Sequence, residues 1–262
     1  MRVSRGLSLV AVGSLCLALI GCDLLDRGRQ RDALWQAEVE AVALAAVADD
    51  AARGEAGAIE SLRESRETIA GLLEAPTTPL SPDVTQRWLR VRDLADAVWS
   101  HREPAQAAEQ AEAELSALVP LLQARLDEVG RLVAEGGTSE QAYQLGRAML
   151  LLDRILRRAE RVRHGGSDMV SQADALVRDQ TILERLLEGL ETGNDELGIK
   201  SIARPEARPL IAEVRQRLAG IQTLAEPLFD VQALLERHDA ATELPAAVDD
   251  LRSALQVARA RR

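Results

Sequence analysis

The sequence has 262 residues and a formal net charge of −10 at pH 7, with 47% hydrophobic and 28% charged residues. This balance is typical of a folded chain and excludes a disordered one. Only 2% of the residues are aromatic, and the chain is rich in Ala, Leu, Arg and Glu, which have high helix propensity. We therefore expect an all-α fold and no β-sandwich or barrel. The acidic balance disfavours a nucleic-acid partner, which requires concentrated positive charge.

The amino terminus has the features of a targeting segment. Arg2 and Arg5 precede an apolar run of fifteen residues, 7–21. A membrane-spanning helix needs about 20 apolar residues, so the run predicts a cleavable signal peptide over residues 1–21.

The run ends in Leu-Ile-Gly-Cys, which resembles the lipobox of bacterial lipoproteins. This resemblance implies that Cys22 is lipidated and becomes the first mature residue, followed by a tether over residues 22–32. An ordinary signal peptide with a chance cysteine is the alternative. Asp23 resembles the retention signal of enteric inner-membrane lipoproteins. We therefore expect an inner-membrane lipoprotein that faces the periplasm of a Gram-negative bacterium, with the outer membrane as the alternative.

Three segments of the remaining chain carry apolar residues at alternating spacings of three and four. Such a repeat predicts helices packed at small crossing angles, and extra apolar neighbours favour a four-helix bundle over a two-stranded coiled coil. The segments comprise Leu115, Val119, Leu122, Leu126, Val129 and Val133; Ala142, Leu145, Met149, Leu152, Leu156 and Ala159; and Met169, Ala173, Leu176, Gln180, Leu183, Leu187 and Leu190.

Turn chemistry predicts where several helices begin and end. Thr138 and Gln141 have the spacing of a capping box, and Ser167 is a candidate N-cap. Pro82 suits the first position of a helix, whereas Pro120 and Pro227 are expected to end or kink helices.

The two halves of the chain resemble each other around residues 67–75 and 180–189. This internal similarity predicts two tandem helical modules, over residues 33–135 and 139–238, followed by a C-terminal helical tail over 239–262.

The segment 178–199 begins with Arg-Asp-Gln-Thr, contains Leu-Glu-Gly and ends in Gly-Asn-Asp-Glu-Leu-Gly-Ile. It resembles the periplasmic sensor region of the type IV pilus methyl-accepting chemotaxis transducers, the PilJ family. Flanking stretches at 139–143, 155–166, 205–208 and 228–231 are similar as well, and the resemblance covers roughly residues 32–238. It implies two tandem four-helix-bundle sensor modules with long antiparallel helices.

One departure from this family concerns the membrane. Its full-length members have a second membrane span and a cytoplasmic signalling coiled coil, whereas no apolar run of about 20 residues follows Cys22 here. We therefore expect a stand-alone lipoprotein, held at the membrane by lipid on Cys22, that acts as a sensor or adaptor in type IV pilus or chemosensory signalling. The resemblance implies a pilin, a pilus assembly protein or a chemoreceptor as partner. The oligomeric state, including a homodimer, stays open.

Two groups of residues are candidate binding elements. Gln180 falls on an apolar seam, so Arg178, Asp179 and Gln180 predict a polar layer that either fixes helix register or lines a ligand pocket. The loop with Gly193, Asn194 and Gly198 is the candidate recognition loop.

No catalytic, cofactor-binding or metal-binding constellation is recognisable, so we do not expect an enzyme. The alternative function is a small-ligand module of the anion-binding type, because related helical modules of nitrate/nitrite sensor kinases bind anions. A positive patch would favour this alternative, and none is evident from the sequence.

Overall fold

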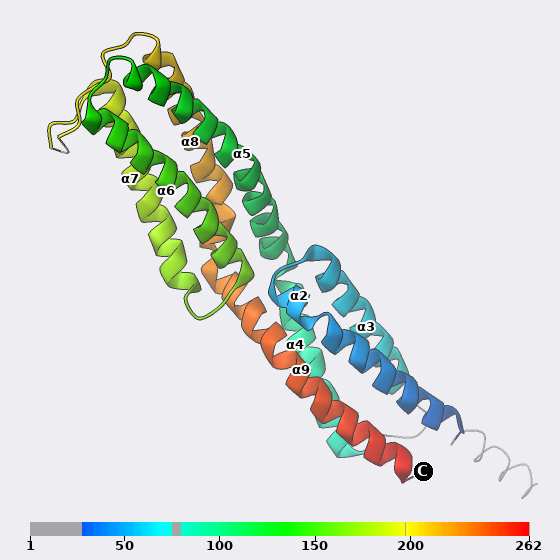
Figure 1. Cartoon of the computed structure of the whole chain (residues 1–262). Helices are drawn as coiled ribbons and strands as arrows, with labels where there is room; N and C mark the ends of the chain where they lie inside the picture. The colour runs from blue at the N-terminus through cyan, green and yellow to red at the C-terminus, as the bar shows by residue number, and fades with distance from the viewer. Residues whose placement is uncertain (1–27, 75–79, 197, 262) are drawn as a thin grey trace, which may run out of the picture. The chain divides into compact units, whose positions relative to one another are not determined.

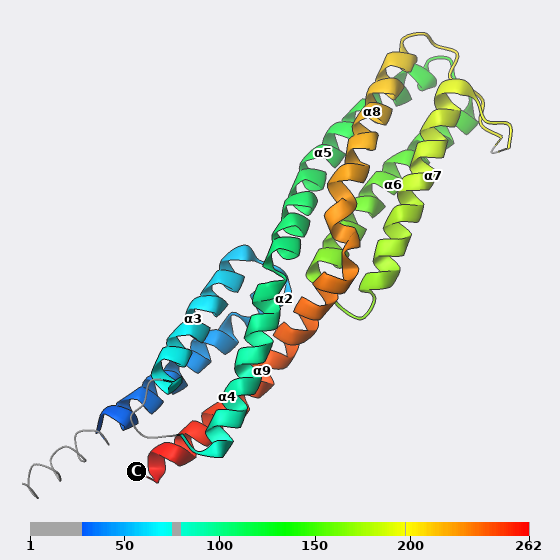
Figure 2. The same cartoon turned by 180° about the vertical axis from the view of Figure 1, so that it is seen from behind.

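The computed structural model describes residues 28–74, 80–196 and 198–261. These residues are almost entirely α-helical, and their only β-type pairing is an isolated bridge between Asn194 and Ile199 (Figures 1 and 2). The predicted all-α fold is confirmed. The expected signal peptide, Cys22 and Asp23 lie outside the described residues.

Most of the helices follow one another with short connections, whereas residues 193–206 join α7 to α8. A first helix covers residues 28–46, so residues 28–32 of the expected tether are helical instead. The later elements are α2 (Ala48–Ala52), α3 (Ala56–Glu74), α4 (Pro82–Ser100), α5 (Arg102–Ala134), α6 (Ser139–His164), α7 (Met169–Thr192), α8 (Ala207–Ala225), the 3-10 helix η1 (Glu226–Phe229) and α9 (Val231–Ala260).

The prolines and caps agree only partly with expectation. α4 begins at Pro82, and the α-helical geometry of α8 ends just before Pro227, as predicted. Pro120, in contrast, lies inside α5 and does not end it. Burial of the apolar stripe of α5 outweighs the local cost of a proline inside a helix, about 3 kcal/mol, which combines a missing hydrogen bond with a steric clash of the ring. The capping box of Thr138 and Gln141 is confirmed, whereas the N-cap of α7 is Asp168 and not Ser167.

The chain divides into two compact units that are interleaved in the sequence. Among the described residues, unit 1 comprises 28–49, 60–74, 80–96 and 241–261, and unit 2 comprises 50–59 and 97–240 without residue 197. The observed units therefore differ from the expected modules 33–135 and 139–238 and from the expected tail 239–262. The physical reason is packing: α5 contacts α6 and α8, and the end of the chain joins the core of unit 1.

Unit 2 contains a four-helix bundle. α5 and α7 each contact both α6 and α8, so the four helices form a closed ring around one core (Figure 1). All six apolar positions of the predicted α5 seam and all seven positions of the predicted α7 seam are buried. In α6 the prediction is wrong at Ala142, which is exposed, while Gln141 and Gln144 are buried nearby.

Unit 1 has its own core of Leu, Val, Ile and Ala side chains, with one buried aromatic ring. Trp88 is 2% exposed, and its indole Nε1 donates to Glu74 Oε1 over 3.1 Å. Glu38 and Arg259 form an ion pair of 3.0 Å. Within the described part of the chain, no helix is both long enough and apolar enough to span a membrane.

Candidate functional site

Asp179 is the buried centre of an ion-pair cluster in unit 2. Its side chain projects from α7 and is 3% exposed, and it receives two arginines from α6. Arg154 Nη2 lies 2.7 Å from Oδ1, and Arg158 Nε lies 2.8 Å from Oδ2. One buried carboxylate therefore fixes the positions of two guanidinium groups.

The other two residues of the predicted polar layer behave differently. Gln180 is 5% exposed, and its Nε2 has no hydrogen-bond partner among the described residues. Arg178 is exposed, so its assignment to the layer is wrong. Successive residues on a helix point in different directions, and residues 178–180 cannot all face the core.

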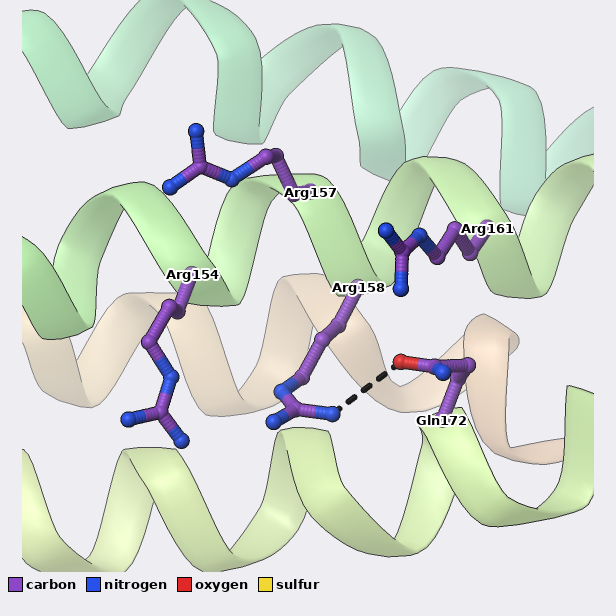
Figure 3. Close-up of a pocket in the computed structure, with 5 residues that line it drawn as sticks. All are labelled: Arg154, Arg157, Arg158, Arg161 and Gln172. Atoms are coloured by element: carbon purple, nitrogen blue, oxygen red, sulfur yellow. Dashed lines mark hydrogen bonds between the residues drawn. The ribbon is translucent and has the colours of Figure 1, made fainter. Parts of the chain in front are cut away.

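A pocket lined by four arginines lies beside this cluster (Figure 3). Its volume is about 160 Å³, and its walls are Arg154, Arg157, Arg158, Arg161 and Gln172. The arginines recur at spacings of three and four along α6, which places them along one side of the helix. Arg154 and Arg158 extend towards α7, where Arg158 Nη1 donates to Gln172 Oε1 over 3.0 Å, whereas Arg157 points away from them (Figure 3).

The lining of this pocket is electrostatically unbalanced. Arg157 pairs with Asp153 on the same helix, and Gln172 Nε2 donates to Asp168 over 2.8 Å. The side chain of Arg161 makes no ion pair or hydrogen bond with any other described residue. Sequence analysis missed this cluster, although four arginines at helical spacing between residues 154 and 161 are a readable signal.

The candidate recognition loop is closed on itself and tied to α6. Asn194 and Ile199 exchange backbone hydrogen bonds of 2.7 and 2.8 Å, while Asp195 and Glu196 between them are exposed. Gln141 Nε2 donates to the carbonyl oxygens of Lys200 and Ser201 over 3.2 and 2.9 Å. The capping-box residue of α6 therefore also holds the base of the loop.

Two glycines of the candidate recognition loop, Gly193 and Gly198, have positive φ angles. Gly193 has φ of 90° and Gly198 has φ of 65°. Both values lie in the region that residues with a side chain rarely adopt. The two glycines thus allow the chain to reverse around residues 194–199.

A buried cation in unit 2 was not predicted from the sequence. Arg237 is 0% exposed, and burial together with the charge of Arg163 lowers its pKa to about 10. Arg163 itself pairs with Glu112 over 3.0 Å. No sequence pattern distinguishes Arg237 from the many arginines that lie on helix surfaces.

The groups gathered at the pocket are suited to binding. Guanidinium and amide side chains donate hydrogen bonds to anions, and they are poor nucleophiles and bases at neutral pH. Among the residues with assigned positions, no group of three or more His, Cys, Asp or Glu side chains is arranged to hold a metal ion.

Two known proteins resemble the chain in sequence. No family model matches the chain. Protein PilJ of Pseudomonas aeruginosa is 26% identical over 264 residues, which cover 92% of this chain and 39% of PilJ. The chain resembles PilJ.

The second of these relatives is named for chemotaxis. AlkN of Alcanivorax borkumensis, a protein named for methyl-accepting chemotaxis, is 27% identical over 198 residues, which cover 70% of this chain and 29% of AlkN. The chain thus spans about two fifths of PilJ and less of AlkN. The predicted PilJ-like resemblance is confirmed.

Proposed function

We propose that the chain is a non-enzymatic, PilJ-like helical sensor lipoprotein. In this proposal, lipid on Cys22 holds it at the inner membrane, facing the periplasm, with the inner membrane selected by Asp23. It acts in type IV pilus or chemosensory signalling through contacts with a protein partner, such as a pilin, a pilus assembly protein or a chemoreceptor.

The observation that carries the proposal is the extent of the similarity to PilJ. The match covers 92% of the chain, so it includes residues from both units. An all-helical bundle with few loops is the frame expected of such a sensor, since helices transmit displacement along their length.

The recognition surface in this proposal is the loop over residues 193–204. It joins α7 to α8, exposes the carboxylates of Asp195 and Glu196, and is held by Gln141. Loops carried on a rigid helical frame are frequent sites of recognition. The acidic tip favours a partner with a basic surface.

Site-specific photo-cross-linking in intact cells tests this surface. A photoreactive amino acid at Asp195 is expected to capture a defined protein partner. The matched control position is Gln86, an exposed residue of α4 in unit 1. This design leaves the bundle whole, whereas deleting residues 139–238 would remove α6, α7 and α8 and with them three of its four helices.

Capture at Asp195 but not at Gln86 supports the proposal, provided that the product contains a pilus or chemosensory protein. Identical products at the two positions, or no product at Asp195, would assign recognition to another surface or exclude it.

A second candidate function is the binding of a small anion. One specific observation favours it, namely the arginine-lined pocket of unit 2. A sensor that binds both a small anion and a protein partner would transmit the presence of the dissolved ion to that partner.

A further inference from the structure

The arginine pocket carries more positive charge than its neighbours neutralise. Four arginines line it, and Asp153 and Asp179 are the carboxylates that pair with them. Two of the four arginine charges are therefore surplus to these ion pairs, while Asp168, which accepts from Gln172, is a further carboxylate at the edge of the pocket. Like charges at a spacing of three or four residues repel one another on a helix, so this surplus favours the uptake of an anion.

The surplus stands out in a chain whose formal net charge is −10. An arginine run with a carboxylate at each helical neighbour would be an ordinary solvated surface. Here Asp179 is shared by Arg154 and Arg158, and Arg161 has no carboxylate partner in the described part of the chain. A solvated ion-pair face therefore does not account for the cluster.

The geometry leaves donors available for a ligand. Asp179 engages one edge of Arg154 and one edge of Arg158, and it holds both groups from below the surface. Arg158 Nη1 also donates to Gln172 Oε1, and the other N–H groups of these two arginines, with those of Arg161, can donate to another acceptor. Planar guanidinium groups bind the oxygen atoms of carboxylates, sulfates and phosphates in a bidentate manner.

The size of the pocket limits the ligand. The cavity measures about 160 Å³, close to the cavity of about 150 Å³ that holds one benzene molecule in another protein. A ligand of a few heavy atoms fills this space, whereas a nucleotide or a peptide segment would extend beyond it.

We infer that this pocket binds a small, doubly charged oxyanion of the sulfate or phosphate type, with Arg154, Arg158 and Arg161 as donors. A dianion neutralises both surplus arginine charges, whereas a monoanion such as nitrate neutralises only one of them. Asp179 does not donate to the ion: it orients Arg154 and Arg158 and neutralises part of their charge. Binding of such an ion is independent of whether the chain takes part in chemosensory signalling.

Calorimetric titration of the full chain in detergent tests this site. Sodium sulfate, phosphate and nitrate are added separately, with the ionic strength kept constant by chloride. We expect saturable binding at one site, tighter for sulfate or phosphate than for nitrate. Arg161→Gln is expected to weaken the dianion dissociation constant by about 10-fold or more, because one charge-assisted contact is lost.

The matched control is Arg147→Gln, which removes the same charge from an exposed position of α6 outside the pocket. Its effect is expected to stay within about a factor of two, as for an isolated surface charge. If Arg161→Gln lowers the helical circular dichroism signal, Arg154→Gln is measured in its place. The absence of saturable dianion binding, equal weakening by the pocket and control variants, or nitrate binding as tight as sulfate would each overturn the inference.

Discussion

Arg237 donates a hydrogen bond of 3.0 Å from Nη2 to the carbonyl oxygen of Ala52, the last residue of α2. The same nitrogen donates to the carbonyl oxygen of Arg163, in the last turn of α6, over 3.2 Å. Carbonyl groups at the end of a helix lack an intrahelical donor and carry the negative end of the helix dipole. One buried cation thus caps two helix ends within unit 2.

Two substitutions of Arg237 distinguish the contribution of its side-chain volume to stability from the contribution of its charge. The lowered pKa, about 10, means that the folded state disfavours the charged form. This unfavourable contribution is complete at pH 7 and diminishes only as the pH rises above the lowered pKa of about 10 towards the ordinary pKa of arginine. Arg237→Met, which keeps the apolar stem, is therefore expected to cost about 1 kcal/mol, and Arg237→Ala about 3 kcal/mol or more. Urea unfolding at pH 7 measures the free energy of unfolding of both variants. Equal losses of stability in the two variants would contradict a contribution from side-chain volume.

Gly54 and Gly146 make a matched pair of substitutions in unit 2. Gly54 has φ of 80°, and an added Cβ would lie 2.3 Å from Arg237 Nη1. Gly146 lies within α6, with nothing within 4 Å of its Cβ position. We expect Gly54→Ala to lower the free energy of unfolding by about 2 kcal/mol and Gly146→Ala to raise it by about 0.5–1 kcal/mol. Thermal unfolding of the two variants would show shifts of opposite sign, and a shared sign would refute the backbone argument.

Gln141 connects the start of α6 to the candidate recognition loop. Its Oε1 accepts from the backbone N–H of Thr138, while its Nε2 donates to the loop carbonyls of Lys200 and Ser201. Gln141→Glu keeps the acceptor and removes the donor. We expect it to accelerate hydrogen exchange of the amides around Ile199 and Ile202 while leaving α6 protected. Thr138→Ala is the control: it costs about 1 kcal/mol by loss of the cap and leaves the tether to the loop intact. Unchanged exchange in the loop of Gln141→Glu would contradict this role.

Asp179→Asn removes the internal counter-ion of the arginine pocket. The loss of two charge-assisted hydrogen bonds is expected to lower the free energy of unfolding by about 1–3 kcal/mol. Sulfate is expected to raise Tm more in this variant than in the unaltered chain, because an added anion replaces the missing carboxylate charge. Sulfate shifts of the same size in both proteins would show that Asp179 does not govern the charge of the pocket. Asp153→Asn, which alters an exposed pair of the same cluster, serves as the comparison.

Cys22→Ser tests the proposed anchor. If the thiol of Cys22 carries the lipid, this variant loses incorporation of a labelled fatty-acid analogue, and its signal peptide stays uncleaved or is cut elsewhere. Cys16→Ser is the matched control, because Cys16 lies within the predicted signal peptide. Equal labelling of both variants and the unaltered chain would exclude lipidation at Cys22.

The sequence predicts helices and seams better than it predicts the division into units. The seams of α5 and α7 are regular, so their burial follows directly from spacing, and the Thr138 cap follows from local chemistry. The unit boundaries depend on which helix packs against which, and α5 could have joined either neighbour along the chain. The arginine pocket was missed because its meaning depends on α7: only the placement of Asp179 and Gln172 converts a run of arginines into a lined cavity.

The pairing of Glu38 with Arg259 has a consequence for how the protein forms. Unit 1 joins residues near the beginning of the described chain to residues near its end, within a single core. During synthesis the helix over residues 28–46 is made well before α9. Its apolar side therefore stays exposed to water until α9 is available. Contacts of such large sequence separation slow folding and lengthen exposure to aggregation. We therefore expect unit 1 to be the slower of the two to form and the one that depends more on chaperones.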